Sequence, residues 1–160
     1  MGFYMKYIFR TMIIATVVLL SACIVPPKQT KTALELQAFQ SKEFETTKKI
    51  AFASTLSVLQ DQGYIIGSAS LDTGLISGKS PTTAVNQFFY QEMKDVKVTA
   101  FVEEITPGRT KVRLNFVNSS SKSGAYGQRS DQDIAIEDPV FYQEIFSKIQ
   151  QGIFVRKNTN

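Results

Sequence analysis

The sequence contains no histidine and only one cysteine, Cys23, among its 160 residues. Without histidine, nucleophilic catalysis by a Ser-His-Asp or Cys-His arrangement is excluded. Histidine and cysteine are also the usual ligands of zinc, so nearly all zinc sites are excluded as well. A single cysteine cannot form a disulfide within the chain, and the fold must therefore be stabilised by packing.

The residues before Cys23 have the parts of a secretory signal. Lys6 and Arg10 form a charged start, and the mostly apolar run Thr11–Leu20 follows. This run is too short to cross a bilayer, which takes roughly 20 residues in a helix. We therefore predict that residues 1–22 are a signal peptide that is removed.

The tetrapeptide Leu20-Ser21-Ala22-Cys23 resembles the lipobox of bacterial lipoproteins. The resemblance implies cleavage between Ala22 and Cys23, a diacylglyceryl group on the Cys23 thiol and acylation of the new amino group. Each buried methylene contributes about 0.8 kcal/mol, so two or three chains hold a protein on a membrane. In such lipoproteins an aspartate after the cysteine retains the protein at the inner membrane, and here the residue is Ile24. We expect an outer-membrane lipoprotein that faces the periplasm, with no cofactor besides the covalent lipid.

The charge of the chain does not indicate a nucleic-acid partner. The formal net charge is +4, and Lys6 and Arg10 leave with the predicted signal. Nucleic-acid binding requires a clustered basic stripe, whereas the adjacent basic pairs here are only Lys48-Lys49 and Arg156-Lys157.

The rest of the chain is long enough for one domain with one core. Residues 23–40 are expected to be the lipidated N-terminus and a tether that Pro26-Pro27 stiffens. Within it Leu34, Leu36 and Ala38 alternate with polar residues, which is typical of an edge strand that docks on the domain. Residues 41–157 form the periplasmic domain.

Two helices and four strands are predicted in this domain. Apolar residues at helical spacing indicate helices at 46–62, with Ser54 on the polar side, and from Pro139 onward behind an Asp138 cap. β-prone or alternating segments indicate strands, namely 64–70, 75–79, 94–105 and 111–118. The fold class is therefore α+β, in two layers: an antiparallel four-stranded sheet with two helices on one face, in the order α-β-β-β-β-α. Residues 80–92 are expected to be a connection and 118–133 a mobile surface loop.

The motifs that suggest chemistry fit their patterns poorly. The run from Gly74 to Ser80 has three residues between its glycines where a phosphate-binding loop has four. Glu103 and Glu104 point to opposite faces of a strand, so they cannot form a glycosidase pair. Asp131 and Asp133 lack the remaining EF-hand spacing. A Ser-Lys site at Ser119–Ser123 requires a buried lysine, which a polar loop does not provide. We therefore expect neither an enzyme nor a metal site.

The candidate contact surface lies in two segments. Tyr126 and Arg129, with Lys122, belong to a Ser/Gly-rich stretch whose composition is typical of adaptable contact loops. Phe88 and Phe89 are either a partner patch or part of the core.

A longer pattern carries a further resemblance. The helix end Leu59-Gln-Asp-Gln-Gly63-Tyr64 leads through Asp72-Thr-Gly74 to Lys79. This pattern is similar to small lipoproteins of Gram-negative bacteria and, more distantly, to the helix-grip domains of the C lipoprotein of the outer-membrane β-barrel assembly machine. The resemblance implies a non-catalytic periplasmic domain that binds other proteins.

Together these features predict an accessory or scaffold subunit of an envelope protein assembly, either barrel-assembly-like or secretion-system-like. Its partners would be the membrane, through the lipid, and other envelope proteins. The alternative is a binder of a small apolar or lipidic ligand between helices and sheet, with Phe52, Phe141 and Phe146 lining the gap.

Overall fold

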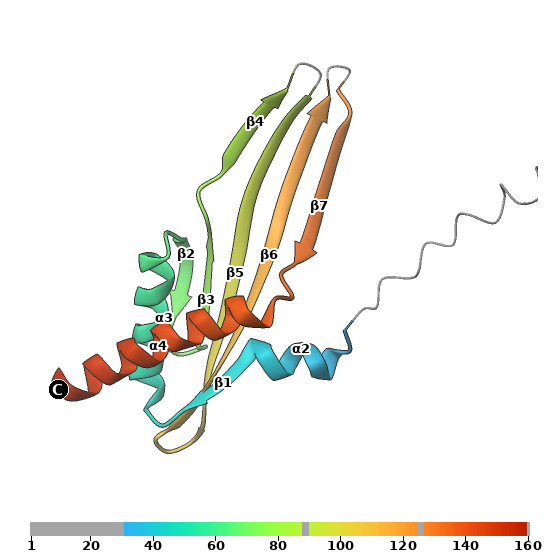
Figure 1. The fold of residues 1–160 in the computed structure, drawn as a ribbon. Helices are drawn as coiled ribbons and strands as arrows, with labels where there is room; N and C mark the ends of the chain where they lie inside the picture. Colours follow the sequence, from blue (N-terminus) through green and yellow to red (C-terminus); the bar gives the residue numbers. More distant parts are fainter. Residues whose placement is uncertain (1–30, 88–89, 125–126, 160) are drawn as a thin grey trace, which may run out of the picture. The chain divides into compact units, whose positions relative to one another are not determined.

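The structure is a computed structural model that describes residues 31–159, apart from 88–89 and 125–126. Residues from Thr32 onward form one compact unit. None of the described helices is long and apolar enough to cross a membrane. The described elements are, in chain order, α2 (Ala33–Gln40), β1 (Ser41–Phe44), α3 (Lys48–Asp61), β2 (Ile65–Ser70), β3 (Leu75–Lys79), β4 (Thr83–Gln87), β5 (Tyr90–Thr106), β6 (Arg109–Gly124), β7 (Arg129–Ala135) and α4 (Pro139–Thr159) (Figure 1).

One long hairpin organises an antiparallel sheet of seven strands. β5 and β6 pair from Tyr90 opposite Gly124 to Thr106 opposite Arg109. Along one half, which we call the body, β3 and β2 extend the sheet beyond β5 and β1 extends it beyond β6. Along the other half, which we call the arm, β4 pairs with β5 and β7 with β6. The arm comprises β4, residues 90–96, residues 118–124 and β7, and Figure 1 shows these strands continuing past the helices.

The predicted α+β class and antiparallel sheet are confirmed, but four strands and two helices are too few. The additional elements in the described chain are β1, β4, β7 and α2. The connection predicted at 80–92 contains β4 and the start of β5, and the loop predicted at 118–133 contains the end of β6 and most of β7. The sequence signal is weak there because strands that bury neither face have no apolar alternation.

The expected edge strand at Leu34–Ala38 is wrong, because this segment is the helix α2. A reciprocal cap starts the helix: Glu35 N donates to Thr32 Oγ1 at 3.3 Å, and Thr32 N donates to the Glu35 carboxylate at 2.6 Å. This capping box satisfies two amides that a helix start leaves unpaired. The edge strand is β1, directly after α2.

The two predicted helices are confirmed as α3 and α4, and Asp138 caps α4 by accepting a hydrogen bond from Val140 N at 2.9 Å. Ser54, however, is fully buried rather than solvent-facing. The reason is that α3 packs against α4 as well as against the sheet. A Cβ atom added at Gly152 would lie 3.4 Å from the Ser54 Cβ, so two small residues allow the helices to approach closely.

The core lies between α3, α4 and one face of the body. The predicted alternation of the central hairpin is confirmed, because Val98, Ala100 and Val102 of β5 are buried together with Val112, Leu114 and Phe116 of β6. The helices contribute to the same cluster. Its helical members are Ala51, Phe52, Val58, Leu59, Tyr142, Ile145, Phe146, Ile149 and Ile153.

The body ends where the central strands change partners. β1 pairs with β6 up to Arg113 and β7 pairs from Val117. Between them Phe116 N donates to the Tyr142 hydroxyl at 3.2 Å, and Gln40 Nε2 donates to the same oxygen at 3.3 Å. The fully buried Tyr142 therefore satisfies a backbone amide that neither edge strand reaches.

A serine has the corresponding role on the other side of the hairpin. β3 pairs with β5 down to Lys97 and β4 pairs from Lys94. Val96 N donates to Ser80 Oγ at 2.9 Å, and Ser80 N donates to Val96 O at 2.8 Å. Pro81 follows at once and has no amide hydrogen to pair.

We predict that Tyr142→Phe lowers the free energy of unfolding by about 1–3 kcal/mol, because it leaves the buried Phe116 amide without an acceptor. Urea unfolding of the full chain measures this. Tyr64→Phe is the matched control, since Tyr64 also packs on the Phe116 ring, at 5.7 Å between centroids, and its hydroxyl bonds to none of the described residues. Equal losses in the two variants would contradict the role of the Tyr142 hydroxyl.

Alkaline pH gives a second readout of the same variant. Burial raises the pKa of Tyr142 above 10.0. Tyr142 therefore loses its proton at a lower pH in the unfolded chain than in the folded one. The free energy of unfolding falls as the pH rises above about 10. The fall should be shallower in Tyr142→Phe.

Candidate functional site

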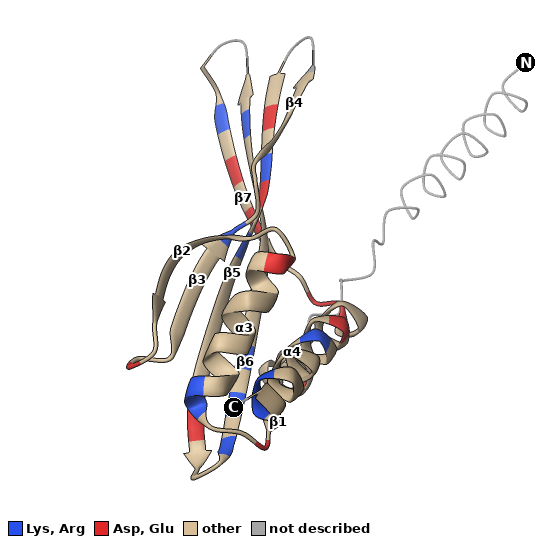
Figure 2. Ribbon diagram, turned by 90° about the vertical axis from the view of Figure 1, so that its left-hand side faces the viewer, with Lys and Arg blue, Asp and Glu red and all other residues tan. Residues whose placement is uncertain are grey.

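The arm exposes both of its faces to solvent. Residues such as Glu92, Lys94 and Val96 continue the helix-side face of the sheet, and Met93, Asp95 and Lys97 lie on the opposite face, because side chains alternate along a strand. Figure 2 shows no described helix over the arm, whose strands carry charged residues of both signs. The arm is therefore a polar surface with no core of its own.

The structure places the described residues of the predicted contact surface, Lys122 and Arg129, at one end of the sheet. Lys122 lies in β6 opposite Glu92 of β5, and Arg129 begins β7 opposite Ser123. The register also places Tyr90 opposite Gly124. The other predicted site residues lie outside the described residues, namely Ala22, Cys23, Phe88, Phe89 and Tyr126.

Glu92 is the centre of a charged cluster on the helix-side face. Its side chain is only 11% exposed, although it belongs to the arm. Lys94 Nζ lies 3.2 Å from Glu92 Oε2, and Lys122 Nζ lies 3.6 Å from Oε1. The Lys122 ammonium also lies 5.8 Å from the centroid of the Tyr90 ring. One carboxylate thus orients two lysines, one on its own strand and one on the facing strand.

Sequence reasoning missed Glu92. A signal was present, because Tyr90, Glu92, Lys94 and Val96 alternate in line with the buried residues of the same strand. Lys122 is half-exposed and ion-paired, so it is not the buried lysine that a Ser-Lys site requires.

The opposite face has separate ion pairs. Lys97 Nζ lies 3.1 Å from Asp133 Oδ2, and Arg129 Nε lies 3.2 Å from Asp131 Oδ1. Hydrogen bonds from Ser121 and then Arg129 lower the pKa of Asp131, and hydrogen bonds from Ser119 and then Lys97 lower the pKa of Asp133. These carboxylates, whose spacing falls short of an EF-hand, therefore bind cationic side chains. The described residues contain no group of three side chains that could hold a metal ion.

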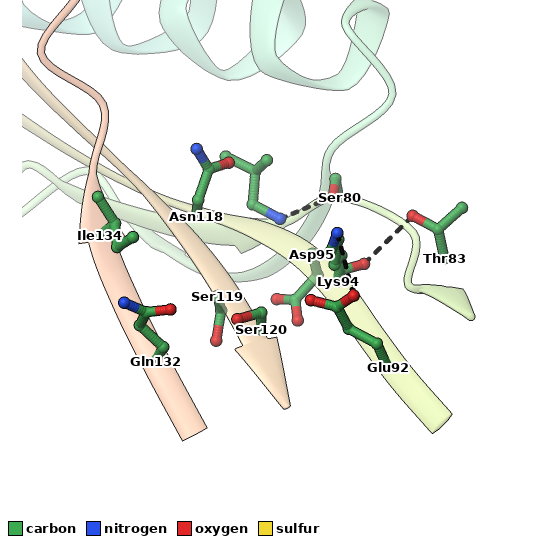
Figure 3. Close-up of a pocket in the computed structure, with 11 residues that line it drawn as sticks. Ser80, Thr83, Glu92, Lys94, Asp95, Asn118, Ser119, Ser120, Gln132 and Ile134 are labelled. Atoms are coloured by element: carbon green, nitrogen blue, oxygen red, sulfur yellow. Dashed lines mark hydrogen bonds and ion pairs between the residues drawn. The ribbon is translucent and has the colours of Figure 1, made fainter. Parts of the chain in front are cut away.

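A polar concavity of about 450 Å³ lies at the base of the arm (Figure 3). The Lys94 ammonium, the Ser120 hydroxyl and the Gln132 amide offer hydrogen-bonding groups there, and Ile134 adds an apolar edge. A second concavity of about 580 Å³ lies on the opposite face, between Lys97 and Asp131. Open, polar hollows of this kind suit contacts with another polar surface better than enclosure of an apolar ligand.

The residues predicted to line an apolar ligand site pack against core neighbours instead. The Phe141 ring lies 4.9 Å from that of Phe116, and the Phe146 ring 6.3 Å from that of Phe44. Phe52 is also buried in the core. Neither the two arm concavities nor a third between α3 and α4 is lined by any of the three rings.

Comparison with known proteins finds similar solved structures. No protein-family model matches the sequence, and no curated protein matches it. Among solved structures, the chain is similar to a DUF4468 family protein from Bacteroides ovatus, with a TM-score of 0.38 and 11% identity over 71% of this chain and 84% of that chain. A likeness at this level carries no information about function.

We predict that Glu92→Gln lowers the free energy of unfolding by roughly 1–2 kcal/mol, since it leaves two lysines without their shared carboxylate. Urea unfolding of the full chain measures the change. Glu103→Gln is the control, because Glu103 is 47% exposed and lies 3.9 Å from its partner Lys111. The control should stay within about 0.5 kcal/mol of the wild type. An equally small effect in Glu92→Gln would show that the cluster does not stabilise the arm.

Proposed function

We propose that this protein is a lipid-anchored periplasmic protein of the outer membrane, and that it acts as a non-catalytic accessory or scaffold subunit of an envelope protein assembly. The arm carries this proposal. It is a pre-formed surface of four paired strands that extends past the helix layer, with polar faces that no described element covers.

The physical argument is that the arm contributes no core and yet is ordered by pairing. Ordering a backbone costs roughly 1–2 kcal/mol per residue, which apolar burial normally offsets. Here strand pairing and ion pairs such as Glu92 with Lys94 take that role. A surface that is already ordered loses little entropy when a partner binds, and partners bind more tightly to such surfaces for the same contacts.

The composition of the arm also suits protein contacts. Its described residues combine Tyr90 and Arg129 with serines, amides and charges of both signs, a mixture typical of adaptable binding surfaces. Exposed apolar side chains are scattered among them, including Met93 at 44% and Ile134 at 48%. The lipobox-like tetrapeptide ending at Cys23 supports the envelope location.

The anchor predicts where the protein fractionates. In Cys23→Ala no thiol remains to accept lipid, so the protein should leave the outer-membrane fraction. Immunoblotting of separated membranes and soluble periplasm measures this. Ser21→Ala is the matched control, because it keeps a small residue before the cysteine and should remain with the membrane. A Cys23→Ala protein that still fractionated with the outer membrane would contradict the proposed lipid anchor.

The scaffold role predicts protein neighbours at the arm. A photo-crosslinking residue at Ser130, which is exposed on β7, should capture a discrete envelope protein in intact cells, identified by mass spectrometry. The same residue at Gln60, exposed on α3, is the control and should not capture that protein. Recovery of no stable neighbour from Ser130, or the same neighbour from both positions, would count against the arm as the contact surface.

A further inference from the structure

Four strand edges end the described sheet, and three of them have features that discourage pairing with another chain. β1 has only four residues and carries Lys42 and Glu43. β7 carries Arg129, Asp131 and Asp133 within seven residues. β2 has a register irregularity between Ile66 and Ser68. Short length, charge and bulges are the devices by which natural sheets protect their edges.

The edge formed by β4 carries neither charge nor a bulge. Its sequence is Thr-Ala-Val-Asn-Gln, and it pairs with β5 in one continuous register. The strand contains no charged residue, proline or glycine. An uncharged β-prone edge is a template for pairing with a further strand when nothing covers it. Among the described residues, β4 has β5 as its only strand partner.

The sheet also has room beside β4. In the body, β2 lies outside β3 and its pairing ends with Ile65 opposite Lys79. The body is therefore five strands across, in the order β1-β6-β5-β3-β2, while the described arm is four strands across. A strand added beside β4 would continue the line of β2 into the arm.

We infer that β4 pairs with β4 of a second copy of this chain, antiparallel, about a two-fold axis at Val85. This axis places Val85 opposite the Val85 of the other copy and Ala84 opposite its Asn86, so that all these pairs are uncharged. Val85 is 41% exposed and becomes covered by its own counterpart. The two arms then form one continuous sheet, joined by main-chain hydrogen bonds as in other cases of strand addition.

The choice of a second copy follows from self-complementarity. A two-fold interface sets each residue against its symmetry partner, so the same strand must tolerate itself. An axis at the central residue of β7, Gln132, would set Asp131 against Asp133 of the other copy, and like charges directly opposite repel. β4 has no charge to repel. The inference goes beyond the proposed function, since it requires no other envelope protein.

A cysteine at the axis tests the geometry directly. Directly opposite residues have Cβ atoms about 4.5–5.5 Å apart, close to the separation that a disulfide spans. Val85→Cys, expressed from the full-length gene and treated in cells with a thiol oxidant, should run on a non-reducing gel at twice the mass of the single processed chain. Ile134→Cys is the matched control on the β7 edge, with similar exposure, and should remain monomeric. Monomeric Val85→Cys, or equal crosslinking of both variants, would overturn the inference.

Charged substitutions at Val85 distinguish a loss of pairing from misfolding. Two differently tagged copies of the full chain are co-expressed, and co-purification in detergent measures their association. Val85→Lys in both copies, or Val85→Glu in both, should weaken association by about five- to tenfold, because like charges meet at the axis. Val85→Lys in one copy with Val85→Glu in the other should restore it. Failure of the mixed pair to recover association would contradict the two-fold register. The proposed function would be unaffected, because the faces of the arm would still be open to other proteins.

Discussion

The hydroxyl of Tyr142 stabilises the region in which the sheet passes from the body, which the helices cover, into the exposed arm. β6 has 16 residues, whereas β1 has four and β7 has seven. The outer edge of β6 is therefore shared by two strands, and Phe116 between them is fully buried. An unpaired amide there would carry the full cost of desolvation. Tyr142 of α4 avoids that cost, because its hydroxyl accepts a hydrogen bond from the amide of Phe116. Gln40, at the end of α2, donates a second hydrogen bond to the same hydroxyl. One oxygen therefore joins three elements that are far apart in the sequence.

The same constraint explains which parts of the fold the sequence could predict. The central hairpin and the helices α3 and α4 bury one face, and burial leaves a periodic apolar pattern such as Val98, Ala100 and Val102. The arm strands bury little, so serines and charges there are indistinguishable from loop residues. α2 was missed for another reason: alternation at Leu34 to Ala38 favoured a strand, while the capping box at Thr32 decided for a helix.

For the candidate site, sequence reasoning identified the segments but not their relation. Arg129 and Lys122 were selected as loop residues, and both lie in paired strands of the arm. Their partners Asp131 and Glu92 depend on strand register and side-chain alternation, which composition does not reveal. Glu92 was hidden because residues around it were assigned to a connection. Only pairing across β5 and β6 shows that it meets a lysine from thirty residues later in the chain.

The two faces of the arm and its edge make different demands on a partner. A face offers side chains: Glu92 with its two lysines on the helix side, and two ion pairs on the other. Contacts with a face of the arm depend on charge complementarity and therefore on ionic strength. The β4 edge offers main-chain groups and uncharged side chains, so pairing there depends little on salt and strongly on register. A second copy on the edge therefore leaves both faces available, and a paired arm would present twice the surface of a single one to any other protein.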